Sequence, residues 1–149
     1  IKGDDMKATT IAKTPPPGVT TETLVKDAIE LMHNETGCAV GVIEGDKLVG
    51  TLTKNDVLKR VVADGRDPAT TKVSEVMSPS PLTAGPDINT EDALKLMFEK
   101  KRCFLPIVEE NGKLVSWLAI CHLFNCHMDM LTDEVDTLTK YIGADGPGG

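Results

Sequence analysis

The sequence predicts an α/β (α+β) fold: two βαββα repeats packed sheet to sheet with pseudo-twofold symmetry, followed by a long C-terminal helix. The first reason is internal similarity, because residues 27–32 (DAIELM) match residues 92–97 (DALKLM), 65 positions later. The same offset relates residues 38–44 to residues 103–109. A unit with one apolar helix face and one apolar sheet face cannot bury both alone, whereas two such units can. We therefore expect two related clefts, each near a strand-to-helix junction.

Each repeat is expected to contain the same elements in the same order. Helices are predicted where apolar residues recur with helical spacing, and strands where short β-rich runs are bounded by turn residues. The opening strand is weak before the first repeat and clearer before the second. The predicted segments are helices at 23–34 and 90–101, and strands at 38–44, 47–53, 81–84 and 103–109.

The chain is expected to divide into five parts. Residues 1–18 have no hydrophobic signal region and end near three consecutive prolines, so we predict a flexible N-terminal arm there. The parts that follow are repeat 1 at 19–65, a linker at 66–79, repeat 2 at 80–128, and a helical extension with a loose tail at 129–149.

The composition argues against several classes of function. The net charge of −7 and the absence of a basic cluster larger than Lys100–Arg102 argue against nucleic-acid binding. The longest apolar run, near residues 114–124, is too short to cross a bilayer, so no membrane partner is expected. The four cysteines form no CxxC pair, which favours reduced thiols in an intracellular compartment, cytoplasmic or organellar. No nucleophile–base–orienter set is visible, so neither an enzyme nor a cofactor is expected.

The segment GTLTKND (residues 50–56) joins a predicted strand to a predicted helix. Thr53 can cap this helix, directing its hydroxyl and the first free backbone N–H groups to one point. Asp56 follows one turn later on the neighbouring face. Hydroxyl and amides suit a phosphate, and a carboxylate suits a pair of sugar hydroxyls, so these groups fit a nucleoside phosphate. Simple N-capping by Thr53 is the alternative.

The segments LVGTLTKND (48–56) and VSEVMSP (73–79), with LPIV (105–108), resemble a tandem pair of cystathionine-β-synthase-type (CBS) domains, the Bateman module. The resemblance covers about residues 19–128. Within it, residues 56–77 are similar to stand-alone CBS-pair proteins of bacteria and plants. Family members commonly bind adenosine derivatives such as AMP, ADP or ATP in the clefts between repeats. The resemblance therefore implies a regulatory, adenine-nucleotide-sensing module.

The resemblance also implies a ligand site. Asp56 would take the ribose hydroxyls, Thr53 would take a phosphate oxygen, and the facing repeat would complete the pocket beside the adenine. The expected ligand-binding residues are Gly50, Thr51, Thr53, Asn55, Asp56, Leu82, Thr83 and Pro106.

The second repeat departs from the family pattern. Ala119 replaces the hydroxyl and His122 replaces the carboxylate, so this cleft loses both polar anchors and at most one nucleotide per chain is expected. Cys103 and Phe104 stand where some relatives place a basic residue. A polyphosphate would then meet few cations in this acidic protein, which favours AMP or another adenosyl ligand over ATP.

A heptad pattern follows the second repeat. Its apolar residues are spaced 4, 3, 4, 3 and 4 apart; they are Phe124, Met128, Leu131, Val135, Leu138 and Ile142. The final helix either packs back on its own module or pairs with another subunit, which would give a homodimer. The alternative to ligand sensing is therefore a ligand-free oligomerisation or partner-docking module. A metal sensor using His122, Cys126 and His127 is a third option, although no metal site is expected because these residues supply too few ligands.

Overall fold

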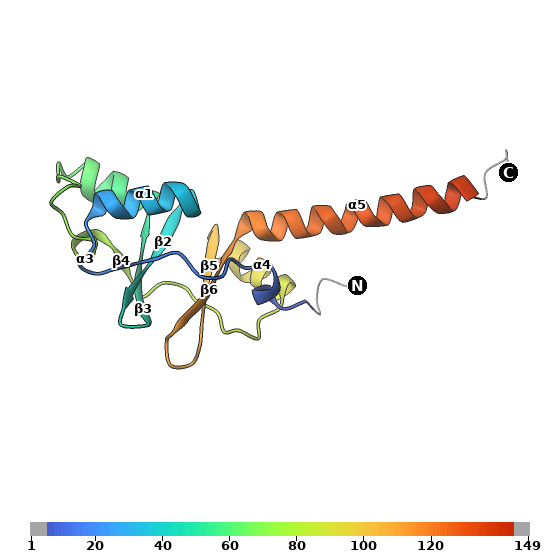
Figure 1. Ribbon diagram of the computed structural model, residues 1–149, viewed down its shortest axis with the longest axis horizontal. Helices are drawn as coiled ribbons and strands as arrows, with labels where there is room; N and C mark the ends of the chain where they lie inside the picture. The colour runs from blue at the N-terminus through green and yellow to red at the C-terminus, as the bar shows by residue number, and fades with distance from the viewer. Residues whose placement is uncertain (1–5, 145–149) are drawn as a thin grey trace.

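The computed structural model describes residues 6–144, with side chains described through residue 140 (Figure 1). The elements of the first half are the 3₁₀ turn η2 (Ala8–Thr10), β1 (Gly18–Thr20), α1 (Val25–Glu35), β2 (Ala39–Glu44), β3 (Lys47–Thr53), α2 (Lys54–Val57), the π-helical turn η3 (Leu58–Val62), α3 (Val73–Val76) and β4 (Ser78–Pro79). Those of the second half are α4 (Thr90–Glu99), β5 (Phe104–Val108), β6 (Leu114–Ala119) and α5 (Ile120–Ala144). The predicted α/β fold with a long final helix is confirmed.

Two sheets form the centre of the molecule. One has four strands in the order β1-β2-β3-β4, in which β1 is parallel to β2 and the other pairs are antiparallel. The other is the antiparallel hairpin β5-β6. The sheets meet where the Leu48 N–H donates to the Gly112 carbonyl at 3.0 Å and the Leu114 N–H to the Asp46 carbonyl at 3.4 Å. Gly41 permits the close approach, because a β-carbon there would lie 3.1 Å from the Leu114 side chain.

Each repeat buries its own hydrophobic core, in which the inward helix face meets the inward sheet face. The first core contains Val25, Ala28, Met32, Val40, Val42, Leu52, Val61, Val73 and Val76. The second contains Ala8, Ala93, Met97, Leu105, Ile107, Leu118 and Leu123. The helices α1 and α4 occupy equivalent positions and agree within about two residues with the predicted bounds.

The N-terminal segment differs from the predicted flexible arm. Residues 6–17 run along the second repeat, where Ala8 is fully buried in the core. The 65-residue offset explains this position, because the segment is the counterpart of residues 71–82. The Thr90 N–H donates to the Met6 carbonyl at 2.8 Å, as the Val25 N–H donates to the Thr71 carbonyl at 2.9 Å. The sequence reading missed this match; residues 1–5 lie outside the described part of the chain.

The same equivalence appears in two surface ion pairs. Lys7 contacts Asp87 with an N···O distance of 3.0 Å, and Lys72 contacts Glu22 at 2.5 Å. Both lysines and both acids are related by 65 positions. The pairs are exposed and contribute little stability. Their equivalence indicates that the second repeat includes residues from about position 6 onward.

The predicted linker at 66–79 is also part of a repeat. Val73 and Val76 of α3 are buried in the first core, and β4 extends the first sheet by pairing with β3. The opening strand was expected to be more evident in the second repeat than in the first, and the structure shows the opposite. The strand β1 is formed in the first repeat, whereas before the second repeat only Ala84 bridges Ile107 within the described residues.

The helix α5 leaves the body after its first turn and extends away from it (Figure 1). Leu123 belongs to the second core, and Cys126 Sγ lies 3.8 Å from Met6 Sδ, but the heptad residues from Phe124 to Leu138 are exposed. The side chain of Ile142 and the predicted loose tail at 145–149 lie outside the described residues. The helix therefore packs on its own module only near its start, and the heptad residues beyond that point are exposed.

The packing of the N-terminal segment can be tested with Ala8→Leu. Extra methylenes in the closed second core should destabilise the fold by about 1–3 kcal/mol, measured by urea unfolding. Thr10→Leu adds a similar side chain at an exposed position of the same turn and serves as the control. Equal stability of the two variants would contradict the burial of Ala8.

Candidate functional site

A cavity of about 490 Å³ lies beside the β3–α2 junction. Its walls come from the first junction, from the segment following α3, and from the start of β5 in the second repeat. The lining residues are Cys38, Thr51, Thr53, Lys54, Asn55, Asp56, Lys59, Arg60, Ser78, Pro79, Ser80, Pro81, Leu82, Lys101, Arg102, Cys103 and Phe104. A volume of this size, enclosed by both repeats, is within the range of small-molecule sites.

Thr53 and Asp56 are held in fixed positions by a reciprocal capping box. The Asp56 N–H donates to Thr53 Oγ1 at 3.1 Å, and the Thr53 N–H donates to Asp56 Oδ2 at 3.0 Å. The box starts α2 at the end of β3 and orients the Asp56 carboxylate before any ligand arrives. The expected N-capping by Thr53 is confirmed, and it accompanies the cavity instead of excluding it.

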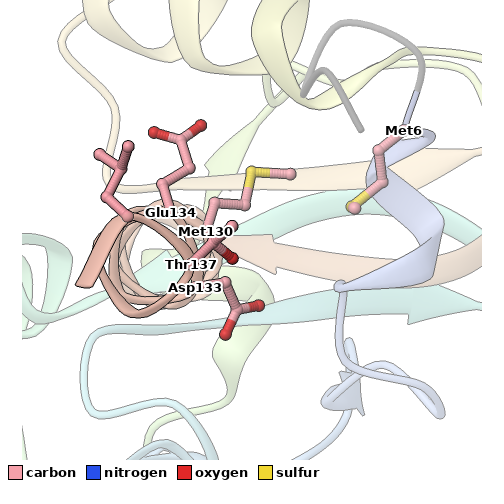
Figure 2. Close-up of a pocket in the computed structure, with 6 residues that line it drawn as sticks. Met6, Met130, Asp133, Glu134 and Thr137 are labelled. Atoms are coloured by element: carbon pink, nitrogen blue, oxygen red, sulfur yellow. The ribbon is translucent and has the colours of Figure 1, made fainter. Parts of the chain in front are cut away.

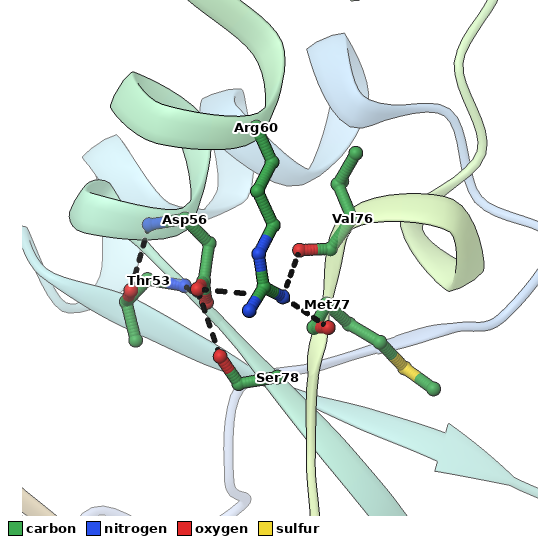
Figure 3. Close-up of polar contacts among 6 residues, drawn as sticks. All are labelled: Thr53, Asp56, Arg60, Val76, Met77 and Ser78. Atoms are coloured by element: carbon green, nitrogen blue, oxygen red, sulfur yellow. Dashed lines mark hydrogen bonds and ion pairs between the residues drawn. The ribbon is translucent and has the colours of Figure 1, made fainter. Parts of the chain in front are cut away.

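The second oxygen of Asp56 connects to the segment after α3 (Figure 3). Ser78 Oγ donates to Asp56 Oδ1 at 2.8 Å, and Arg60 Nη1 lies 3.9 Å from the same oxygen. Arg60 also donates to the carbonyls of Val76 at 3.1 Å and Met77 at 2.7 Å. Asp56 is 8% exposed, so its carboxylate is both partnered and accessible from the cavity.

Sequence reasoning missed Arg60 and Ser78. The i,i+4 spacing of Asp56 and Arg60 was a usable signal for an ion pair on one helix face. Ser78 had no comparable local signal, because only the pairing of β4 with β3 brings it to Asp56.

Five cationic side chains line the cavity, which corrects the expectation of few cations. They are Lys54, Lys59, Arg60, Lys101 and Arg102, while Asp56 is the single carboxylate among the lining residues that the structure describes. Lys101 adopts a left-handed conformation with φ of 54°, and the Arg102 N–H donates to the Met97 carbonyl at 2.8 Å. This C-terminal cap of α4 brings two cations to the cavity from the second repeat.

The remaining walls are neutral. Leu82, Pro81 and Phe104 supply apolar surface, and Phe104 stacks on Trp117 with ring centroids 5.0 Å apart. Burial, followed by the neighbouring Cys103, raises the pKa of the Cys38 thiol, so this side chain is uncharged at neutral pH.

The structure brings together five of the eight predicted site residues: Thr51, Thr53, Asn55, Asp56 and Leu82 line the cavity. Gly50, Thr83 and Pro106 do not. Gly50 has a packing role, because a β-carbon there would lie 2.8 Å from the Ser78 carbonyl oxygen. Pro106 is buried in β5, where its carbonyl accepts the Ala84 N–H at 3.1 Å.

The second junction keeps the cap but changes its chemistry. The Ala119 N–H donates to His122 Nδ1 at 3.1 Å, as the Thr53 N–H does to Asp56. An accepting Nδ1 requires the neutral imidazole. Burial, and then the nearby Lys13 ammonium, lower the pKa of His122. Trp117 is fully buried at the position equivalent to Thr51, so the second junction has a large indole where the first has a small side chain that lines the cavity.

Two absences concern the described residues alone. No cluster of three or more His, Cys, Asp or Glu side chains between residues 6 and 140 is arranged to hold a metal ion. Within the same part of the chain, no helix has the length and hydrophobicity needed to cross a membrane.

Two repeats of one α/β unit, with a cavity between them and a capping carboxylate in one copy, define a tandem-repeat module. The family model for the CBS domain matches residues 8–63 and 73–125, so this chain belongs to the CBS domain family. The first matched segment begins at the buried Ala8, in agreement with the packing of the N-terminal segment.

Curated relatives support the assignment. The chain is 36% identical over 98 residues to an uncharacterized protein of Methanopyrus kandleri, covering 66% of this chain and 50% of that protein. It is 39% identical over 88 residues to the CBS domain-containing protein YhcV of Bacillus subtilis, covering 59% and 62% respectively. The chain thus spans half of the first relative, and 19% of the Arabidopsis thaliana protein CBSCBSPB1.

Solved structures share the fold. A signal-transduction protein with CBS domains from Burkholderia ambifaria has a TM-score of 0.72 at 28% identity, covering 83% of this chain and 95% of that one. CBSX2 from Arabidopsis thaliana has a TM-score of 0.65 at 27% identity, covering 87% and 95%. CBSX2 in complex with AMP has a TM-score of 0.70 at 24% identity, covering 83% and 97%.

The histidine cap predicts a pH dependence of stability. Because the folded-state pKa of His122 is lowered from its usual 6.5, the unfolded chain binds the proton more readily. The stabilisation is complete above the unfolded pKa and is lost as the pH falls below it. Thermal unfolding between pH 5 and 7.5 should therefore show a lower melting temperature at acidic pH.

His122→Asp is the matched variant, because it restores the carboxylate cap of the first repeat. The fall in melting temperature near pH 6 should be smaller in this variant than in the wild type. Identical pH profiles for the two proteins would show that His122 is not the titrating group.

Proposed function

We propose that this chain is a regulatory module that binds an adenine nucleotide in the cavity between its two CBS repeats. The observation that carries the proposal is the position of the Asp56 carboxylate in a cavity whose other lining side chains are cationic, neutral polar or apolar. A carboxylate accepts from vicinal ribose hydroxyls, and cations attract phosphates. Apolar walls suit a purine.

The residues divide by the part of the ligand they would contact. Asp56 would accept from the ribose, and Thr53 would donate to a phosphate oxygen. Leu82 and Phe104 would flank the base. Gly50 and Pro106 would act indirectly, by setting the spacing of the strands around the cavity. Thr83 would follow Leu82 just beyond the wall.

The cations change the expected ligand preference. AMP was favoured on the ground that a polyphosphate would meet few cations, and five cationic side chains at the cavity remove that ground. We therefore extend the proposal to ADP and ATP. Relatives of this fold provide precedent for both ends of the range, since CBSX2 has been solved with AMP and the cytosolic domain of the channel MgtE with ATP.

A regulatory role follows from the way the cavity is built. Its walls belong to both repeats, so a ligand that contacts both walls favours one relative arrangement of them. Asp56 is already bonded to Ser78 and paired with Arg60, and Arg60 holds two carbonyls of the same segment. Ribose binding at Asp56 would compete with these bonds and shift the segment after α3. The shift is limited by the ligand's differential affinity for the two arrangements.

The first test is Asp56→Asn, which keeps an oxygen acceptor for the Thr53 N–H and removes the charge. Loss of a charge-assisted hydrogen bond costs about 1.5–3 kcal/mol, which weakens nucleotide affinity by roughly tenfold or more. Isothermal titration with AMP, ADP and ATP measures the affinity and the stoichiometry, which is expected to be one per chain.

Asp129→Asn is the control, because it removes the same charge from an exposed position on α5. It should bind as the wild type does. Wild-type protein that binds none of the three nucleotides would refute the proposal, and two equivalent sites per chain would refute the assignment of the second junction as inactive.

The second test separates phosphate recognition from nucleoside recognition. Lys101→Ala/Arg102→Ala should weaken ATP binding severalfold more than AMP binding, since each exposed charge contributes about 0.2–1 kcal/mol. The difference should shrink at high salt because screening weakens the cationic contribution. Lys113→Ala/Lys140→Ala removes the same charge away from the cavity and should leave the ATP-to-AMP ratio unchanged.

A further inference from the structure

An apolar stripe on α5 has no partner among the described residues. The stripe consists of Phe124, Met128, Leu131, Val135 and Leu138, which are 64%, 46%, 55%, 59% and 59% exposed. The helix that carries the stripe extends well beyond the body of the molecule (Figure 1). A helix in water depends on packing of its apolar face, because propensity alone leaves short isolated helices marginal. The stripe therefore requires a partner surface.

The spacing of the stripe specifies what kind of surface that is. Alternating steps of four and three residues place Met128 and Val135 at the a positions of a heptad, and Leu131 and Leu138 at the d positions. A β-branched residue at a combined with leucine at d favours two parallel helices. Val135 between Leu131 and Leu138 provides this combination in the part of α5 farthest from the body.

The charges on α5 are compatible with pairing to an identical helix. Asp129, Asp133 and Asp136 fall at the outer b and f positions, away from the stripe. At the flanking g position, Glu134 would face Thr139 of the other helix in a parallel pair, so no like charges meet there. An acidic chain can therefore self-associate along the stripe without bringing its carboxylates together.

A second face of α5 is directed toward the N-terminal segment and shares a single residue, Leu138, with the stripe. Figure 2 shows Met6 across an open groove from Met130, Asp133, Glu134 and Thr137. Met130 and Thr137 occupy c positions, Asp133 an f position and Glu134 a g position of the heptad. Leu138 at d is the one stripe residue that also lines this groove, so the other four stripe residues remain free for a partner.

We propose that α5 pairs with α5 of a second copy of this chain in a parallel, two-stranded coiled coil along the stripe. The pairing places both nucleotide-binding modules at the same end of the dimer. It does not depend on nucleotide binding, because none of the stripe residues lines the cavity at Asp56.

The oligomeric state of the full chain tests the pairing. Sedimentation velocity at micromolar concentration should give twice the monomer mass for the wild type. Leu131→Glu/Leu138→Glu should give the monomer, because four carboxylates would then face one another across the stripe. Thr137→Glu/Lys140→Glu adds the same two side chains outside the stripe and should remain dimeric. Since the substituted residues are exposed, unchanged near-UV circular dichroism confirms that both variants keep the folded module.

The parallel orientation is tested by cross-linking in a variant whose four native cysteines are replaced by serine. Leu138→Cys in this background should form an intermolecular disulfide under mild oxidation, because identical d residues face each other only in a parallel, in-register pair. Thr137→Cys, one position off the stripe, should cross-link at least tenfold more slowly. A monomeric wild type, a dimer unaffected by the stripe glutamates, or equal cross-linking at the two positions would each overturn the proposal.

Discussion

The crossing of the chain between the two repeats is the constraint on which the rest of the structure depends. From Met6 the chain runs against the second repeat, passes into the first, and returns to the second. Ala8 closes a core whose other members lie between Ala93 and Leu123, so the second core requires contacts over a long sequence separation. This route ties the repeats together at both ends and fixes the cavity between them. Neither repeat presents the site alone, because Lys101 and Phe104 face Thr53 and Asp56 only after the two halves dock.

The two strand-to-helix junctions share one type of helix cap, made by different side chains. Each strand-to-helix turn is closed by a side chain three residues into the helix that accepts the N-cap N–H, Asp56 in one copy and His122 in the other. The carboxylate has a second oxygen, which accepts from Ser78 Oγ and which, in the proposed function, would accept from a ligand hydroxyl. The imidazole is neutral and has its remaining nitrogen as a donor, so it keeps the cap but offers no comparable anchor. Trp117 and Phe104 stack together beside this second junction.

The net charge of the whole chain and the charge around the cavity have opposite signs. The whole chain carries −7, whereas the described side chains around the cavity include five cations and a single carboxylate. The concentration of cations comes from two distant segments, one around Lys54 and one around Lys101. Overall composition therefore argues against nucleic-acid binding but gives no information about the local electrostatic field in the cavity.

The sequence by itself determined the repeat, the helices and central strands, the cap at Thr53 and Asp56, and the loss of both anchors in the second copy. These features depend on local periodicity and on residue identities at fixed spacing, which a single sequence contains. Tertiary structure alone decided the burial of the N-terminal segment, the contact of Ser78 with Asp56, and which of the predicted site residues line the cavity. Those features depend on strand pairing and on docking between residues about 20 to 80 positions apart, as in the bond from Ala8 to Ile88 and the pairing of β4 with β3. Thr83 and Pro106 lie outside the cavity for the same reason, since the register of β5 and its neighbours directs other side chains into it.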